Sequence, residues 1–341
     1  MVANIATKSN GEVRMAHTDN VEPWWGIGNK ITDPTDQELT LKEANMDFEY
    51  LVRTPKITLT VEPTDSLTHA WPCTQDSKWC RAIVVRESDG TETEISQCGT
   101  VWKPHQPSDI IEFYRQISQS FDLRLETAGV LGNFHKIWAM ARVPEKIRVI
   151  DDEVHTFISF ITGVRGTATY TAGHTCAIVC QNTMQIALSE GSAVKYTHHQ
   201  ELDVDAAVRN LNIDMSAFQK YETQAVRMAH TRAKPELAAK YFQELLLGPR
   251  IPDWYGDKED NRMVKYSREY DQLQNALFNS PGQRMVSRDQ TVYGLLNAAT
   301  FWTDHSRRTK NGGDGRASSI LTGESARIKR RAWDMAVRLA A

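Results

Sequence analysis

The chain has 341 residues, of which 40% are hydrophobic and 24% are charged, and its formal net charge is -3. This composition is typical of a soluble globular protein, and the length exceeds a single typical core. Five cysteines are too sparse for a disulfide scaffold, and no stretch approaches the roughly 20 apolar residues that span a bilayer. We therefore expect a cytoplasmic protein with reduced thiols and no membrane contact.

The N-terminal part of the chain predicts a loose arm followed by an anchor. Residues 1–20 are polar, and the adjacent Trp24 and Trp25 then predict a segment that packs onto the body of the protein. Residues 36–45 can form a short helix. We assign residues 1–45 to an N-terminal arm and anchoring segment.

Strand patterns dominate residues 46–200. The predicted strands cover residues 48–53, 57–61, 81–87, 93–98, 123–130, 135–143, 154–162, 167–170 and 175–180. Ser88-Asp89-Gly90 predicts a hairpin turn, and an apolar stripe predicts a helix over residues 107–120. The fold class that follows is α+β: a twisted, mostly antiparallel sheet with packed helices, followed by a helical C-terminal region.

The last predicted strand leads into an unusual joint. The run from Thr175 to Cys180 predicts a strand that is buried on both faces. Gln181, Asn182 and Thr183 interrupt the run, and the spacing from residue 184 to residue 188 predicts a helix that Asn182 or Thr183 could cap. The two cysteines of this strand lack the second ligand pair of a zinc site, so core packing is the preferred interpretation and no metal is expected.

Helical spacing dominates residues 201–341. Pro235 fits the first position of a helix over residues 236–247, and Gly248 fits the position after its end. Residues 290–304 predict a strongly apolar helix, and residues 322–339 predict a final amphipathic one.

Cations concentrate near the C-terminal end. Between residues 307 and 331 they outnumber the carboxylates of Asp314 and Glu324, and they are Arg307, Arg308, Lys310, Arg316, Arg327, Lys329, Arg330 and Arg331. Such a segment suits the phosphate backbone of a nucleic acid. The alternative is a solvated, charge-rich terminus without a ligand.

A second group of polar residues precedes the helical region. Lys195, His198 and His199 could contact phosphate or act in acid–base chemistry, whereas an exposed histidine pair is the alternative. The chain has no Walker A, Gly-x-Ser-x-Gly or His-Glu-x-x-His pattern, and no cofactor is expected.

Four segments together resemble one known family. They are Pro23-Trp24-Trp25-Gly26-Ile27-Gly28, Leu125-Glu126-Thr127-Ala128-Gly129 with Trp138, Val179-Cys180-Gln181-Asn182-Thr183, and Tyr293 to Thr300 with Asp304-His305. They are similar to the motifs of the phage/plasmid-like protein family, a domain of unknown function numbered 932. The resemblance implies a gene carried by phages or plasmids of a host bacterial cell, and it implies no activity. It also implies structural roles for Trp24, Trp25, Gly129, Trp138, Cys180, Gln181, Asn182, Thr183, Asn297, Asp304 and His305.

The leading hypothesis is a single-strand DNA-binding or annealing protein of phage recombination that works without nucleotide hydrolysis. The basic residues would neutralise the backbone, and Trp302 would stack on bases. Annealing proteins act as homo-oligomers, and a phage exonuclease or a host single-strand-binding protein is a further expected partner.

Two alternatives belong to other classes. An enzyme of nucleic-acid or nucleotide metabolism would bring Asn182, His198, His199, Asp304 and His305 together in a cleft. An inhibitor of a host defence system would have neither that cleft nor a basic groove.

Overall fold

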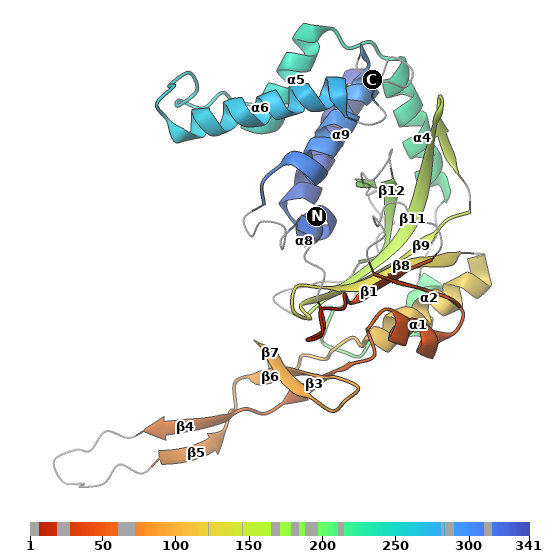
Figure 1. Ribbon diagram of the computed structural model, residues 1–341, viewed down its shortest axis with the longest axis vertical. Helices are drawn as coiled ribbons and strands as arrows, with labels where there is room; N and C mark the ends of the chain where they lie inside the picture. The colour runs from red at the N-terminus through yellow and green to blue at the C-terminus, as the bar shows by residue number, and fades with distance from the viewer. Residues whose placement is uncertain are drawn as a thin grey trace, which may run out of the picture.

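The fold is α+β, as the sequence predicts (Figure 1). The computed structural model describes residues 7–18, 28–60, 72–121, 123–144, 146–164, 171–178, 184–187, 197–210, 215–280, 283, 290–309 and 316–341. A curved sheet lies at the centre, with a helical layer at the C-terminal side and a smaller sheet on the other side (Figure 1).

The larger sheet is antiparallel except at one edge. Its strands are β1 (Met15–His17), β2 (Asn29–Lys30), β8 (Arg124–Leu131), β9 (Lys136–Arg142), β10 (Ile147–Val149), β11 (Asp152–Gly163), β12 (Thr171–Ile178) and β13 (Met184–Ala187). They lie in the order β13-β12-β11-β9-β8-β1-β2, with β10 beside β11. Within the described strands, β1 and β2 form the one parallel pair.

The joint after the predicted buried strand differs from its prediction. Residues Met184–Ala187 form the edge strand β13, which pairs with β12, so the prediction of a helix there is wrong. Pairing along β12 satisfies the backbone N–H and C=O groups of this short apolar segment, which periodicity alone cannot assign to helix or strand. β13 also contacts α9. Residues 179–183, where the capping role was predicted, lie outside the described residues.

A smaller sheet and a two-stranded ribbon extend from the body. The sheet has the order β3-β6-β7, from β3 (Glu49–Arg53), β6 (Arg81–Arg86) and β7 (Glu92–Cys98). The ribbon pairs β4 (Lys56–Thr60) with β5 (Pro72–Asp76) and projects away from the rest of the molecule (Figure 1). The predicted hairpin turn joins β6 to β7, and Gly90 supplies its positive φ of 85°.

Both faces of the larger sheet are covered near β9. Ile137, Ala139 and Ala141 of β9 belong to the main core, as their period-2 spacing predicts. The intervening Trp138 and Met140 pack with α8 (Arg316–Thr322) on the opposite face.

The helix α2 (Pro107–Phe121) covers the main-core face of the sheet. The Tyr114 hydroxyl of α2 lies 2.7 Å from the Ala139 carbonyl oxygen and 3.0 Å from that of Ile158, so it bonds to neighbouring strands. Asp109 accepts a hydrogen bond from the Gln106 N–H at 2.8 Å near the start of this helix. The predicted helix over residues 107–120 is therefore confirmed.

The remaining helices gather at the C-terminal side. They are α1 (Gln37–Glu43), α3 (Val204–Asn210), α4 (Met215–His230), α5 (Pro235–Leu247), α6 (Asn261–Asn279), α7 (Val292–Phe301) and α9 (Glu324–Ala340), with a π-helical turn η2 (Trp302–Ser306) after α7. Among them, α1 and α3 stand apart, since both lie beside α2. Pro235 begins α5 and Gly248 ends it at a φ of 84°, as predicted.

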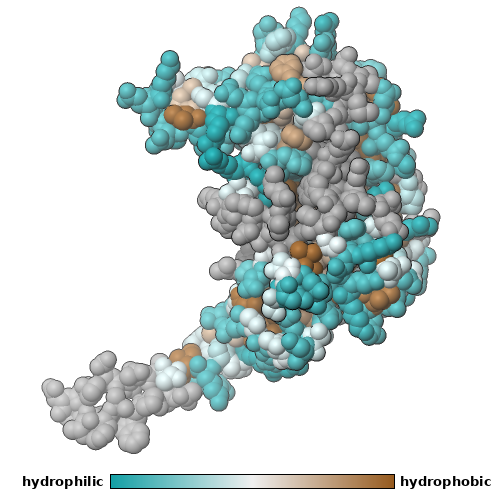
Figure 2. All heavy atoms as spheres, viewed as in Figure 1, coloured by the Kyte–Doolittle hydropathy of each residue, from teal (hydrophilic) through white to brown (hydrophobic). Residues whose placement is uncertain are grey.

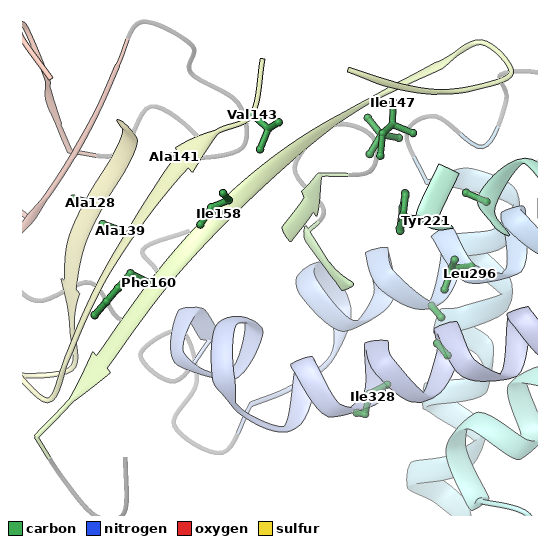
Figure 3. Packing of buried hydrophobic residues seen from close by; sticks show 14 of the residues in the cluster. Ala128, Ala139, Ala141, Val143, Ile147, Ile158, Phe160, Tyr221, Leu296 and Ile328 are labelled. Atoms are coloured by element: carbon green, nitrogen blue, oxygen red, sulfur yellow. The ribbon is translucent and has the colours of Figure 1, made fainter. Parts of the chain in front are cut away.

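One hydrophobic cluster joins the sheet to these helices. It includes Phe160 on β11, Tyr221 on α4, Leu296 on α7 and Ile328 on α9, which Figure 3 shows along the path from the sheet to the helical layer. Across β8, β9 and β11, Ala128, Ala139 and Phe160 are neighbours in register. The boundaries predicted at residues 45 and 200 stay a prediction.

The N-terminal segment is fastened by a buried arginine. Arg14 is 2% exposed, and its Nη1 donates to the Asn45 carbonyl oxygen at 3.0 Å while its Nη2 pairs with Glu87. Its guanidinium also lies 4.5 Å from the centroid of the Phe134 ring. The predicted anchor Trp24-Trp25 lies outside the described residues.

The surface in Figure 2 is mostly hydrophilic where it is coloured. In the part of the chain that the structure describes, no helix combines the length and apolar character needed to cross a membrane.

Candidate nucleic-acid interface

Two of the C-terminal cations, Arg316 and Lys329, contact the end of a buried helix. α7 is buried on all sides from Val292 to Thr300, and Thr291 caps its start by accepting from the Gly294 N–H at 3.0 Å. The helix then widens into the π-helical turn η2, where Thr303 Oγ1 donates back to the Ala299 carbonyl oxygen at 2.6 Å. Turns of this kind are frequent at functional sites because they reorient the side chains that follow.

A buried ion pair ties this turn to α9. Lys329 Nζ lies 2.9 Å from Asp304 Oδ1, and the two side chains are 0% and 1% exposed. Burying either charge alone would cost several kcal/mol, so each requires the other. Lys329 therefore fixes η2 against α9 and is not free for a phosphate.

Arg316 of α8 holds the exit from the same turn. Its Nη1 donates to the Asp304 carbonyl oxygen at 2.6 Å, and its Nη2 donates to the Arg307 carbonyl oxygen at 3.2 Å. A planar guanidinium suits such a two-point contact. The Arg316 guanidinium therefore fixes the backbone that leads to the side chains of Arg307 and Arg308.

Five predicted cations keep access to solvent. Arg307 is half-buried, and Arg308, Arg327, Arg330 and Arg331 are exposed. Arg327 pairs with Glu324 at 2.6 Å, and Arg331 Nη2 donates to the Leu245 carbonyl oxygen. Among the described residues, the side chains of Arg307, Arg308 and Arg330 have no carboxylate partner.

The structure corrects three of the predicted contacts. Lys329 is buried in its ion pair, and Trp302 is 1% exposed with its Nε1 donating to Gln272 Oε1 at 3.0 Å, so it cannot stack on a base. His198 is 5% exposed. In all three cases tertiary packing outweighs the surface role that local sequence suggested. Lys195 and Lys310 lie outside the described residues, and His199 is exposed.

His198 belongs to a buried stack of rings. Its ring lies 4.3 Å from that of His105 and 4.7 Å from that of Trp102, centroid to centroid, and its Nδ1 bonds to the Lys103 carbonyl oxygen at 2.7 Å. Burial lowers the pKa of His198, and burial together with the neighbouring His198 lowers the pKa of His105 to about 3. Both imidazoles are therefore neutral at pH 7. The stack joins the chain before β8, at Trp102 and His105, to the chain after β13, at His198.

Most of the family-motif residues that are described are buried, and His305 is half-buried. Gly129 on β8 faces Trp138 on β9, and a Cβ at Gly129 would lie 3.2 Å from Trp138 Cζ2 and 3.0 Å from the Arg14 carbonyl oxygen. Asn297 is 8% exposed, and its amide forms no hydrogen bond among the described residues. The His305 ring lies 4.6 Å from that of Phe301.

The cleft of the alternative enzyme hypothesis cannot be built from the described residues. His198 lies in the ring stack with Trp102 and His105, whereas Asp304 lies in the cluster with Lys329 and Arg316. Cys180, Gln181, Asn182 and Thr183 lie outside the described residues. Where side chains are described, no three His, Cys, Asp or Glu residues are grouped as a metal ion would require.

A surface depression of about 300 Å³ lies elsewhere, between α1 and the smaller sheet. Leu41, Phe48, Arg86 and Glu87 are among the residues that line it. No predicted site residue contributes to this lining. It is therefore separate from the basic end of the chain.

Fold and site together define an α+β protein whose basic C-terminal end is built on a buried ion pair. The chain belongs to the family described as domain of unknown function DUF932, whose match covers residues 94–325. No curated protein and no solved structure matches it.

Proposed function

We propose that this protein binds single-stranded nucleic acid, as a phage- or plasmid-encoded protein that anneals DNA strands in recombination without hydrolysing a nucleotide. The observation that carries the proposal is the Arg316 contact to the carbonyl oxygens of Asp304 and Arg307. This contact fixes the backbone at Arg307, next to Arg308. Among the described residues, no carboxylate pairs with the side chain of either arginine.

Three further arginines of the predicted set lie on α9, the helix whose Lys329 pairs with Asp304. Arg330 is exposed beside the buried Lys329, and Arg327 and Arg331 are exposed with one polar partner each. Guanidinium groups on a fixed backbone bind phosphates with little loss of conformational freedom. The proposed mechanism is neutralisation of the phosphate backbone by these five arginines, with the strand held extended for pairing.

Salt-dependent binding is the direct test. Fluorescence anisotropy should be measured with labelled single-stranded and duplex DNA from about 50 to about 300 mM salt, with light scattering to determine the oligomer. We expect tighter binding to the single strand, by an oligomer. Each phosphate contact should add about 0.7 to the slope of log affinity against log salt.

Two double variants distinguish a specific contribution of Arg307 and Arg308 from the effect of removing any two positive charges. Arg307→Ala/Arg308→Ala should weaken binding and lower the salt slope, whereas Arg124→Ala/Arg268→Ala removes the same charge from exposed positions on β8 and α6 and should change neither. Equal loss in the two double variants, or no binding by the wild type at the lowest salt, would overturn the proposal.

A further inference from the structure

Trp79 is the most exposed of the large hydrophobic side chains that the structure describes, at 86%. It lies in the short connection between β5 and β6, where the ribbon leaves the smaller sheet. The other described tryptophans are buried or half-buried. An indole left in water forfeits the free energy that burying its large apolar surface would supply, and it offers a partner a flat apolar face with a polar N–H at its edge.

The backbone that carries Trp79 is held by its own hydrogen bonds. Ser77 is 3% exposed, and its Oγ accepts from the N–H groups of Trp79 and Cys80 at 3.3 and 3.2 Å. Arg81 Nη1 donates to the carbonyl oxygens of Ser77 and Cys80, both at 2.9 Å. The turn is therefore organised before any partner arrives, and ordering it on binding costs little.

Two exposed lysines and one exposed carboxylate lie near Trp79 in the chain and in the strand register. Lys78 precedes it and is exposed, and Lys56 is exposed opposite Asp76 in the ribbon register. Among the described residues neither lysine has an ion-pair partner, whereas Arg53 on β3 is neutralised by Glu92 at 2.8 Å. An exposed planar ring with exposed cations next to it in the chain and in the strand register can stack on a base while the cations contact its phosphates.

We propose that Trp79 stacks on an unpaired base of a bound single strand, with Lys56 and Lys78 contacting the flanking phosphates. This inference rests on the proposed function and extends it, because it assigns base contact to the β5–β6 turn and leaves backbone contact to the C-terminal arginines. It also replaces the stacking role that Trp302 cannot perform.

The test compares Trp79→Ala with Trp79→Phe. On an ordinary single strand, the loss of one stacked base should weaken binding by about fivefold to about a hundredfold in Trp79→Ala, and Trp79→Phe should retain most of the affinity. The salt slope should be the same in all three proteins. Because the indole is exposed, the midpoint of thermal unfolding should not move.

Two further ligands make the result specific to bases. An abasic single strand of the same length, and a duplex, should bind wild type and Trp79→Ala equally. Unchanged single-strand affinity in Trp79→Ala would overturn the stacking role and leave the proposed function standing, as would a loss that is equal on the abasic strand. Failure of the wild type to bind any of the three ligands would overturn both.

Discussion

The ammonium group of Lys329 lies 2.9 Å from the Asp304 carboxylate, and the surrounding protein excludes water from both. The two residues are on different helical elements, η2 and α9, so the pair fixes the angle at which the chain leaves α7. Together with Arg316, it fixes the backbone from which the side chain of Arg307 projects.

Breaking this pair on one side should destabilise the fold. Asp304→Asn leaves a buried ammonium without a counter-charge, and we expect it to lower the free energy of unfolding by about 3–5 kcal/mol in urea titrations. The double variant Asp304→Leu/Lys329→Met should recover most of that loss. Glu244→Gln, in the exposed pair with Arg338, is the control and should cost less than about 1 kcal/mol. Equal losses in the two single variants would contradict a special role for the buried pair.

A methyl group at Gly129 should not fit. The new Cβ would lie 3.1 Å from Met15 Cβ and 3.2 Å from Trp138 Cζ2, so Gly129→Ala should lower the free energy of unfolding by about 1–3 kcal/mol. Gly99→Ala, where a Cβ would meet nothing within 4 Å, is the matched control. Trp138→Phe removes the opposing ring atoms, so its combination with Gly129→Ala should cost less than the sum of the two.

Tyr114→Phe should weaken the packing of α2 on the sheet. The substitution deletes a hydroxyl that lies between the carbonyl oxygens of Ala139 and Ile158 and keeps the ring in place. We expect a loss of about 1 kcal/mol in the free energy of unfolding, typical of one buried hydrogen bond. Thermal and urea unfolding measured on both proteins would check this, and unchanged stability would show that the hydroxyl is not needed there.

The free energy of unfolding should decrease as the pH is lowered, because of the two histidines in the ring stack of Trp102, His105 and His198. Because the pKa of both histidines is lowered in the folded protein, the unfolded chain binds more protons once the pH drops below about 6.5. The contribution is fully present above that pH and is lost progressively as the pH falls toward about 3, where His105 protonates in the folded state. One histidine in this window contributes about 1.4 kcal/mol per pH unit. His105→Phe should flatten the pH dependence between about 6 and about 4, and an unchanged profile would contradict the assignment.

Sequence patterns predicted those features of the fold that depend on local chemistry. The alternation of Ile137, Ala139 and Ala141, the turn at Gly90 and the end of α5 at Gly248 each reflect a backbone preference of a few neighbouring residues. The helix prediction for the short segment Met184–Ala187 was wrong because β12 supplies its strand partner, and a segment of four residues is too short to distinguish a helical period from a strand period. α6, which is largely polar, falls in the region predicted as helical but was not assigned as an individual helix.

The site was harder to predict because its contacts join distant parts of the chain. A row of cations in the sequence does not reveal that Lys329 faces Asp304, 25 positions earlier, or that Trp302 faces Gln272 on α6. Helical phase was the available signal, since Lys329 lies four positions after the buried Ser325 and three before the buried Ala332 on α9. For His198, the neighbouring rings of Trp102 and His105 are almost 100 residues away.

The β4–β5 ribbon behaves differently from the sheet to which it is attached. Its strands pair only with each other among the described strands, and its root is tied by the Ser77 N–H to the Pro55 carbonyl oxygen at 2.9 Å. Two strands without further neighbours are marginally stable in water, whereas β8 and β9 are paired on both sides. Amide hydrogens of the ribbon should therefore exchange for deuterium long before those of β8 and β9, and a protease should cut the ribbon while the rest of the chain stays folded.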